Sequence, residues 1–477
     1  MSEQAPNLPP TPEQPDPPDQ PARAGQLDPP GPASKRAGHI LSNRSFLRLW
    51  LAQVVSSLGD WIGLIAILAL ANRISKSGTG VGLVMTARML PGFMLAPVGG
   101  ALIDRWDRRR VMVTCDIGRA GLLALLPFVN TLVGLVCISF ALEVLSLLWG
   151  PAKDASVPNV VPAEQLSTAN SLGLVAAWGT FPIGGAIFGA LAVIAKWLGG
   201  FSALGRFSVD QESLAFWADS LTFIASALFI VRLRLPRHER GTVETIAWGQ
   251  TYRDVVGGLS FIRGDPLVRG VMIGIAGGLL GGGVMVPLGP TFARSVLGGG
   301  AGAFALLMTA LGMGAAIGVP TLLWMQRHLP TAKVFLVAVA ATGIGIVTVA
   351  CVSTLAPAIV IVVLVGAAAG SAYVTGFTVL QESVADELRG RIFGALYTIV
   401  RLCLLLSLTV GPFASSLLDA ISHRTINRRV HVGGVSISLP GVRLALLLGG
   451  VITILSSVAA RRRMRRAQHE HVVGGIA

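Results

Sequence analysis

Charged residues are scarce in this sequence: Asp, Glu, Lys and Arg make up only 13% of its 477 residues. Soluble domains carry roughly 25%. Hydrophobic residues make up 52%, and the mean hydropathy is +0.68. Such a chain cannot hide its apolar surface in water, which excludes an ordinary soluble protein. Because a membrane-spanning helix needs about 20 mostly apolar residues, the length allows about twelve spans with loops and tails.

Several catalytic and binding signals are also missing. The sequence has no Gly-x-x-x-x-Gly-Lys-Ser/Thr loop and no soluble stretch long enough for a nucleotide-binding domain, so direct use of ATP is not expected. Its seven histidines form no metal-ligand or nucleophile pattern, so we expect no enzyme, no cofactor and no metal site. Four cysteines lie in apolar runs without paired spacing, and we expect them to be reduced: Cys115, Cys137, Cys351 and Cys403.

The N-terminus lacks the pattern of a cleaved signal peptide, so we expect the first apolar span to direct insertion. Residues 1 to about 34 hold 11 of the 27 prolines and almost no large apolar side chains, which predicts disorder. This segment is either a tail without a partner or a Pro-rich recognition ligand. We assign 1–42 as a disordered Pro-rich cytoplasmic tail.

The remaining chain predicts an all-α polytopic membrane protein of two pseudo-symmetric six-helix halves, at 43–234 and 269–460. A cytoplasmic linker at 235–268 separates them, and a basic cytoplasmic tail follows at 461–477. The predicted spans lie at about 46–72, 79–103, 111–130, 131–150, 167–196, 213–234, 269–292, 301–325, 332–353, 355–380, 391–420 and 441–460. Glu164 and Glu387 lie in similar short motifs, one in each half. The same number of residues that separates them also separates Phe46, at the start of the first span, from Arg269, at the start of the seventh. This separation is the repeat offset. This agreement indicates duplication, as in many secondary transporters.

The net charge is +14, but the basic residues lie between apolar segments and form no single face, so no nucleic-acid partner is expected. Basic residues in such positions indicate which side of the membrane each loop lies on. If the number of spans is even, both termini and most of the basic residues that flank the spans lie on the same side of the membrane. Because basic flanks mark the cytoplasmic side, we expect a cell-membrane protein with both termini in the cytoplasm. These flanks contain Lys35, Arg36, Arg44, Arg48, Arg105, Arg108, Arg109, Arg110, Arg327, Lys333, Arg389, Arg391 and the run from Arg461 to Arg466. Arg424, Arg428 and Arg429 lie on the opposite side and conflict with this rule.

A short motif follows the second predicted span. Gly100 is followed by Asp104 and Arg105, and then by the basic pair Arg108 and Arg109. This resembles the signature loop of the major facilitator superfamily. The resemblance implies that the loop latches the two halves together in one state of alternating access. An ordinary basic flanking loop is the alternative.

The sequence departs from that family pattern at two places. Asp107 stands where the family usually has a second glycine, a departure known in its drug-efflux branches. The equivalent stretch of the second half, Met325 to Lys333, keeps basic character but lacks the acidic residue. We therefore expect an asymmetric latch.

Further matches resemble the macrolide-efflux and siderophore-exporter branch of this superfamily. They are Asn43-Arg-Ser-Phe-Leu-Arg-Leu-Trp50, Ser57-Leu-Gly-Asp60, Trp149-Gly-Pro-Ala, Asn170-Ser-Leu, Ala218-Asp219-Ser-Leu-Thr-Phe223 and Glu387-Leu-Arg-Gly-Arg-Ile-Phe393. The leading hypothesis is a monomeric drug:proton antiporter in the lipid bilayer, which exports a small apolar or amphiphilic compound such as an antibiotic. Export of a siderophore or lipid-like metabolite, or a membrane sensor or scaffold that does not transport, remain the alternatives.

Prolines and glycines mark candidate bends. Pro182 and Gly185 in the fifth span partly match an antiporter motif, and Pro412 lies in the eleventh span. Proline removes a backbone donor and glycine allows close packing, so these positions predict a helix bend or gate. The glycine-rich seventh span, from Gly274 to Gly283, is a second candidate gate. Ordinary close packing is the alternative for both.

Charged residues within apolar spans are candidate coupling sites, because each costs about 2.5–3.5 kcal/mol near a helix centre. We assign proton coupling or substrate binding to Asp60, Arg88 and Glu143. Desolvation favours the neutral form of a carboxyl group, so Asp60 or Glu143 could exchange protons. The alternative for either is a structural pair with Arg88.

Four more charged residues lie in predicted spans. Asp116 and Arg119 are spaced i,i+3, which predicts a static ion pair on one helix face. Asp219 lies near the entrance of its span, where it is expected to be interfacial, and a functional role is the alternative. Arg401 lies in the eleventh span.

Overall fold

The computed structural model describes residues 40–94, 106–198, 210–233, 265–326, 329–383, 386–432 and 435–474. Most of the predicted N-terminal tail and linker lie outside these ranges, as do Gly100, Asp104 and Arg105 of the predicted latch. The described residues are helical apart from short turns and one small hairpin. This confirms the predicted helical class.

The first half contains seven described α-helices: α2 (Arg44–Ser75), α3 (Gly78–Met94), α5 (Arg108–Leu125), α6 (Leu132–Asp154), α7 (Leu166–Trp178), α8 (Phe181–Leu198) and α9 (Gln211–Val231). The second half contains α11 (Pro266–Gly282), α12 (Met285–Ser295), α13 (Gly300–Gln326), α14 (Thr331–Cys351), α15 (Leu355–Ser383), α16 (Asp386–Ile426) and α17 (Gly441–Gly474). Strands β1 (Arg429–Val432) and β2 (Val435–Ser438) pair antiparallel between α16 and α17, with Arg429 opposite Ser438.

Eleven helical stretches within the described ranges are long and apolar enough to cross a membrane. Helix α3, with 17 described residues, corresponds to the predicted second span. Each of the other predicted spans also has a counterpart, and two of them consist of a helix pair, α7 with α8 and α11 with α12. The predicted break at Asn130 and Thr131 is confirmed, because the Thr131 hydroxyl accepts a hydrogen bond from Gly134 N (3.2 Å) and caps α6.

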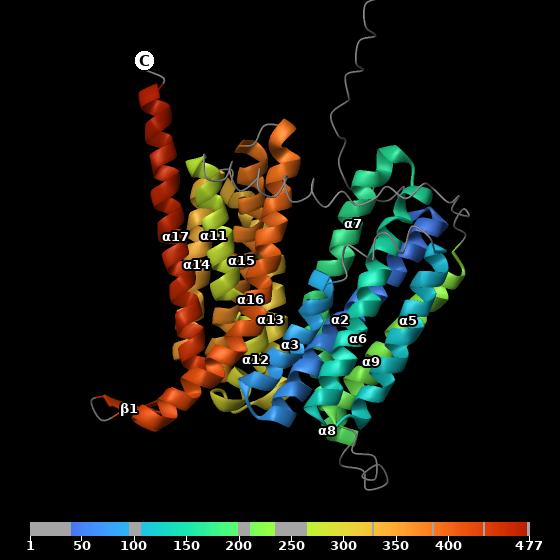
Figure 1. The fold of residues 1–477 in the computed structure, drawn as a ribbon, viewed down its shortest axis with the longest axis horizontal. Helices are drawn as coiled ribbons and strands as arrows, with labels where there is room; N and C mark the ends of the chain where they lie inside the picture. The colour runs from blue at the N-terminus through green and yellow to red at the C-terminus, as the bar shows by residue number, and fades with distance from the viewer. Residues whose placement is uncertain are drawn as a thin grey trace, which may run out of the picture.

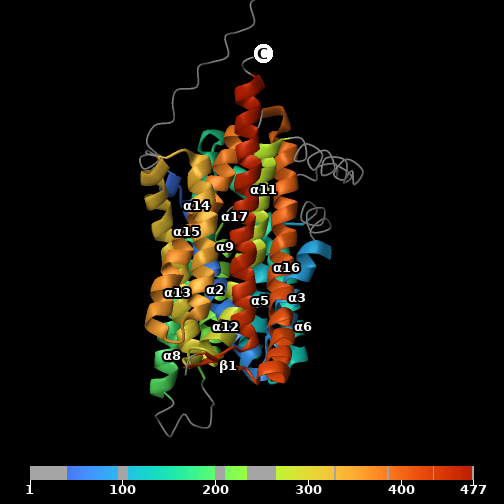
Figure 2. The ribbon, with the colours of Figure 1, turned by 90° about the vertical axis from the view of Figure 1, so that its left-hand side faces the viewer.

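The helices form two bundles that meet toward one end of the molecule (Figure 1). At the end where α17 finishes, each half has its own hydrophobic cluster, one around Phe46 and Trp149, the other around Phe335 and Leu380. Toward the opposite end, a single cluster runs through both halves and joins Phe216 to Phe304. Helix α17 extends beyond its neighbours along the outer side of the second half (Figure 2). Within the part of the chain that the structure describes, the halves are therefore joined at one end and separate at the other.

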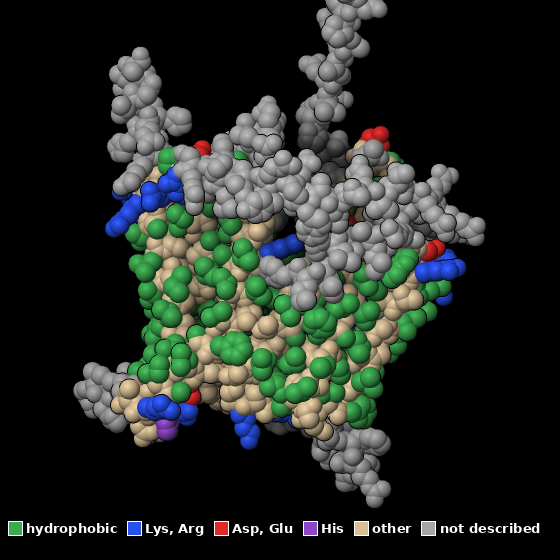
Figure 3. Space-filling model, in the orientation of Figure 1, with side chains coloured by type: hydrophobic (Ala, Val, Ile, Leu, Met, Phe, Trp, Pro, Cys, Tyr) green, Lys and Arg blue, Asp and Glu red, His purple; other side chains and the backbone are tan. Residues whose placement is uncertain are grey.

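The outer surface fits a lipid environment. Hydrophobic side chains cover much of the visible face between the two ends, and Lys and Arg side chains gather at the ends (Figure 3). Large side chains such as Val133 (73% exposed) and Leu364 (63% exposed) point outward. Within a bilayer these residues would contact acyl chains, so the chain is a multi-pass membrane protein. All four cysteines are free; Cys115 and Cys403 are buried as packing residues, whereas Cys137 and Cys351 are exposed.

Candidate functional site

A cluster of six charged side chains lies among the described helices of the first half. They come from five helices: Asp60 of α2, Arg88 of α3, Asp116 and Arg119 of α5, Glu143 of α6 and Asp219 of α9. The counts are uneven, with four carboxyl groups against two guanidinium groups. No group of His, Cys, Asp and Glu suited to a metal ion occurs among the described residues. The cluster is thus a site of net negative charge when every carboxyl group is ionised.

Arg119 and Asp116 form the centre of this cluster. The Arg119 Nη2 donates to Asp116 Oδ1, which confirms the predicted i,i+3 ion pair. Ser226 Oγ donates to the other Asp116 oxygen at 2.7 Å. The Arg119 guanidinium lies 4.0 Å from the Phe223 ring centroid and 5.3 Å from that of Trp149. Both charges are fully buried, and their mutual contacts offset the cost of desolvation. Sequence reasoning missed Ser226, and it named Trp149 and Phe223 only as parts of family-like motifs, without this contact.

The three predicted coupling residues lie around this pair. Arg88 Nη2 is 3.6 Å from Glu143 Oε2, so the structural pair considered for Glu143 is present. The same pair was considered for Asp60, and here it is wrong: Asp60 Oδ2 approaches Arg119 Nη1, at 4.0 Å. The Asp60 side chain is 41% exposed, against 21% for Glu143 and 15% for Arg88. Asp60 is therefore the most accessible carboxyl group of the cluster.

Asp219 lies deeper than its sequence position suggested. The expected interfacial position is wrong, because the residue is only 2% exposed and faces α2. A Cβ on Gly59 or Gly63 of α2 would overlap the Asp219 carboxyl oxygens, so the side chain lies in a notch left by these two glycines. The i,i+4 spacing of the glycines around Asp60 was the signal in the sequence that could have revealed this notch.

A small cavity joins these groups. It measures about 10 Å³ and is lined by Asp60, Arg88, Arg119 and Asp219, together with apolar residues such as Phe223. This volume is close to the minimum for one water molecule. The Nε of Arg119 is buried and lacks a hydrogen-bond partner within the described part of the chain. The cavity therefore lies between an accessible carboxyl group, Asp60, and a buried one, Asp219.

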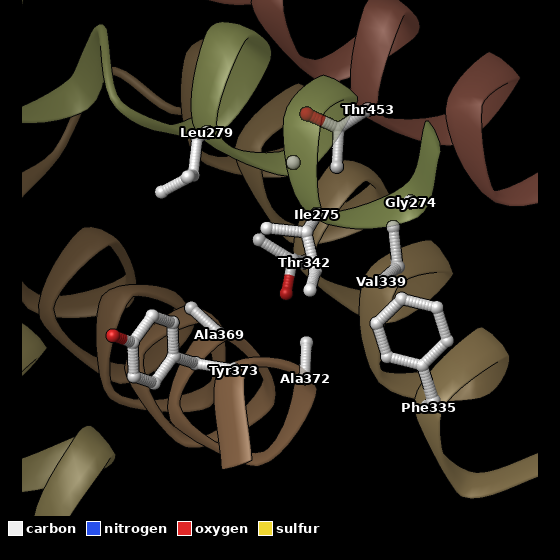
Figure 4. Close-up of a pocket in the computed structure, with 11 residues that line it drawn as sticks. Gly274, Ile275, Leu279, Phe335, Val339, Thr342, Ala369, Ala372, Tyr373 and Thr453 are labelled. Atoms are coloured by element: carbon white, nitrogen blue, oxygen red, sulfur yellow. The ribbon is translucent and has the colours of Figure 1, made fainter. Parts of the chain in front are cut away.

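The second half has an apolar cavity at a corresponding place. It measures about 80 Å³ and lies among α11, α14, α15 and α17 (Figure 4). At the predicted repeat offset, Thr342 and Ala369 in its wall correspond to Arg119 and Ser146 in the wall of the first cavity. Charged groups line the first cavity, whereas the wall of the second consists of uncharged residues, among them Gly274, Ile275 and Phe335. Arg401 lies outside this cavity, exposed on α16.

The described part of the predicted latch binds within its own half. Arg108 Nη1 donates to the Ala155 carbonyl at 2.7 Å, beyond the end of α6, and Arg109 Nη1 approaches the Leu233 carbonyl at 3.4 Å, beyond α9. Asp107 accepts from Arg110 N (2.9 Å) and caps α5, which explains an acidic residue at this position. The latch between halves stays a prediction.

The predicted bend residues lie at the boundary between halves. Gly179 and Thr180 interrupt the α7 and α8 pair just before Pro182, whereas Pro412 lies within the continuous helix α16. Pro182 packs on Gly312 of α13, and Gly185 packs on Thr309 of the same helix. On the other side of the boundary, Pro412 packs on Gly78 and Gly82 of α3. These residues serve as contact points in this conformation, and a gating role stays a prediction.

A hydrogen-bonded contact also joins the halves at the end of α2. Thr291 Oγ1 of α12 donates to Asn72 Oδ1 at 2.9 Å, and Arg294 Nη1 is 3.3 Å from the Asn72 carbonyl oxygen. Asn72 is buried, so these bonds are shielded from water. The glycine-rich seventh span is interrupted nearby, at Gly283 and Val284 between α11 and α12. Sequence reasoning did not find this contact.

Residues 49–408 match the family model of the Major Facilitator Superfamily. The chain belongs to this superfamily. Members are transporters and not enzymes, in line with the sequence expectation. The match spans both halves and includes the charged cluster of the first half as well as the cavity of the second, apart from Thr453.

Curated relatives within the superfamily are similar at low identity. The Bacillus subtilis MFS-type transporter YfiS, described as uncharacterized, is 26% identical over 48% of this chain and 51% of its own length. An uncharacterized MFS-type transporter of Mycobacterium tuberculosis, Rv0037c, is 27% identical over 77% of this chain and 84% of its own length. The chain thus spans about half the length of the Bacillus relative and most of the mycobacterial one.

Solved transporters share the fold. A bacterial homologue of the human lysosomal transporter Spinster, in an inward-facing and unoccupied conformation, gives a TM-score of 0.67 with 14% identity, covering 91% of this chain and 98% of that one. The nucleoside transporter NupG gives 0.62 with 12% identity, covering 88% and 98%. At such identities the likeness concerns the MFS fold alone.

Proposed function

We propose that this protein is a proton-coupled exporter of small apolar or amphiphilic compounds, in the drug:proton antiporter branch of the superfamily. The observation that carries the proposal is the charged cluster of the first half, where the accessible Asp60 lies beside the buried Arg119 at 4.0 Å. Buried charges in a membrane protein are costly, and they commonly mark proton or ion pathways. Asp60 is the first candidate for proton exchange and Glu143, paired with Arg88, is the second.

The arrangement of the halves supports alternating access. Joined at one end and separate at the other, they form one of the two states that such a transporter needs. We assign the separated end, where α17 finishes, to the cytoplasm of a cell membrane, because the sequence places its basic flanks there. The basic loop containing Arg428 then lies outside. In this state the Arg108 and Arg109 side chains would leave the second half and bind carbonyl groups of their own half, as observed.

The apolar cavity of the second half is the proposed place for an apolar group of the substrate. Its 80 Å³ is far below the roughly 300–1,000 Å³ of a drug-sized pocket, so it would hold only part of a molecule. Its wall is dominated by side chains without charge, and Tyr373 contributes a hydroxyl group at its edge (Figure 4). The rest of the substrate would lie between the halves. This division favours an amphiphilic compound over a fully polar one.

The test is transport in proteoliposomes under an imposed pH gradient, with a macrolide antibiotic as probe and a panel of lipophilic compounds beside it. Wild type should accumulate the probe against its gradient only when the pH gradient is present. Asp60→Asn or Glu143→Gln should abolish this dependence and retain downhill exchange. Glu164→Gln changes an exposed residue outside the cluster and should behave as wild type. If both cluster variants still pump with the wild-type dependence on pH, neither residue couples protons.

A further inference from the structure

Asp219 has fewer stabilising partners than the other buried carboxyl groups of the cluster. Among the described basic side chains, none lies within 4.0 Å of its carboxyl oxygens, whereas Asp116 and Glu143 each have an arginine partner. Its side-chain hydrogen bond is with Thr222, whose hydroxyl lies 3.2 Å from Asp219 Oδ1. That hydroxyl has one hydrogen and lies closer, at 2.7 Å, to the main-chain carbonyl of Asp219. The carboxyl group therefore receives little compensation for its burial.

The neighbouring helices do not supply the missing charge. The charged groups around Asp219 are Asp60 of α2, Arg88 of α3, Asp116 and Arg119 of α5 and Glu143 of α6. Arg88 and Arg119 are already engaged with Glu143 and Asp116. Residues 181–195 of α8, which also packs on α9, carry no charge. An isolated ionised carboxylate in such a place is costly, and neutralisation is the usual outcome.

The cavity connects this buried group to an accessible one. Asp60 and Asp219 line the same 10 Å³ space, which accommodates about one water molecule. Arg119, only 2% exposed, lines that space too, and its Nε has no partner within the described residues. A water molecule there would bridge the two carboxyl groups. Both requirements of a short proton path, an accessible entry and a sheltered end, are present.

We propose that Asp219 is a proton-storage site behind Asp60, occupied by a proton in this conformation. Hydronium at the accessible side gives a proton to the Asp60 carboxylate and leaves water. The proton then passes through the cavity water to the Asp219 carboxylate, which becomes a carboxylic acid while Asp60 returns to a carboxylate. The notch formed by Gly59 and Gly63 leaves room for the acid without a cationic partner. The inference rests on the proton coupling proposed above.

The test uses infrared spectroscopy of the purified full chain in lipid, titrated with pH. The carbonyl stretch of a buried carboxylic acid should be present in wild type, shift upon exchange into D₂O and weaken at alkaline pH. Asp219→Asn should lose this band. Glu212→Gln removes another buried carboxyl group of α9, which is near Arg73 (3.9 Å) and outside the cavity, and it should leave the band unchanged. A band unaffected by Asp219→Asn would overturn the inference.

A second variant keeps the inference testable if Asp219→Asn does not fold. Gly63→Ala keeps the carboxyl group but places a methyl group against it, so the band should change position without being lost. Gly121→Ala on α5, where a Cβ would meet nothing within 4 Å, is the matched control and should show the wild-type band. An identical band in Gly63→Ala and wild type would contradict the assignment to Asp219.

The experiments distinguish failure of the proposed function from failure of the inference about Asp219. If Asp60→Asn keeps wild-type proton-driven transport of the macrolide probe, the coupling assigned to Asp60 is wrong, whatever the infrared band shows. If Asp219→Asn loses the band yet transports with unchanged pH dependence, Asp219 holds a proton that transport does not use, and the storage role is overturned. Loss of both the band and the pH dependence in Asp219→Asn supports the inference.

Discussion

Pro182 packs against Gly312 across the boundary between the two halves, with its Cα 2.8 Å from the position that a Cβ on Gly312 would take. The contact has a counterpart, because Pro412 packs on Gly82 from the other side of the boundary. The two prolines are as far apart in the sequence as the two glycines are. Each half thus places a proline against a glycine of the other. Duplication of one six-helix unit explains this reciprocal pair.

Gly312→Val should weaken the contact between halves, because the Pro182 backbone leaves no room for a Cβ. Overpacking costs about 1–3 kcal/mol, which corresponds to a population shift of about 5- to 150-fold. The readout is a disulfide between Gly189→Cys and Ala305→Cys in a cysteine-free background, since their Cβ atoms would lie 3.5 Å apart. Cross-linking should fall with Gly312→Val and stay normal with Gly302→Val, which meets open space. Equal cross-linking in both would contradict a tight contact.

Thr291→Val should favour the opposite state of the transporter, because it removes the hydrogen bond to Asn72 at the joined end. One such bond is worth about 0.5–1.5 kcal/mol, so the equilibrium should shift about 2- to 12-fold. Spin labels at the exposed Asn159 and Ser383 report the separation of the halves near the other end. Their distance distribution should move to shorter values, while Thr348→Val, which loses a bond within α14 only, should leave it unchanged.

Arg119→Met should destabilise the first half by about 3–5 kcal/mol, because it leaves Asp116 buried without its cation. Adding Asp116→Asn should recover part of the loss, since the remaining side chain is then neutral. Denaturant unfolding in detergent measures both variants. The exposed pair Arg428 and Asp419 is the control, and Arg428→Met should cost at most about 1 kcal/mol. A double variant no more stable than Arg119→Met would refute this account of the pair.

Gly278→Leu should reduce binding of an apolar substrate, because a Cβ at this position points into open space in the wall of the second cavity. If the variant weakens binding of the substrate equally in the ground state and in the transition state, KM rises and kcat stays unchanged. Kinetics of macrolide transport in proteoliposomes provide the measurement. Gly121→Leu occupies equally open space on α5 and should keep the wild-type KM. An unchanged KM in Gly278→Leu would remove the cavity from the substrate path.

The helical fold and the two halves were predictable because long apolar runs leave a membrane chain few alternatives. Even the weakly marked break at Asn130 and Thr131 was correct, since a threonine there caps the next helix. Partners across helices were harder to predict. The sequence placed Asp60 next to Arg88 only by hypothesis, and the structure instead puts Arg119 within 4.0 Å of Asp60. The spacing of residues in the sequence predicts contacts within one helix, such as those at i,i+3. It does not predict which faces of two separate helices pack together.

Depth was the other quantity that the sequence left open. Asp219 lies in the first half of α9, and this position suggested an interface. Its burial depends on Gly59 and Gly63, which belong to α2 and lie far from it in the chain. The hydrogen bond between Asn72 and Thr291 could not be predicted either, because neither residue belongs to a recognisable motif. The bond is apparent only when α2 and α12 are placed side by side.

The separation of charged and apolar cavities between the halves has a consequence for how such a protein can change over generations. Substitutions around Gly274, Ile275 and Phe335 alter the apolar wall without touching an ion pair of the first half. Under the proposed function, mutation could retune the range of exported compounds while the energy source stays the same. New resistance traits would then be expected to arise from changes in the second half, with Asp60, Arg119 and Asp219 kept intact.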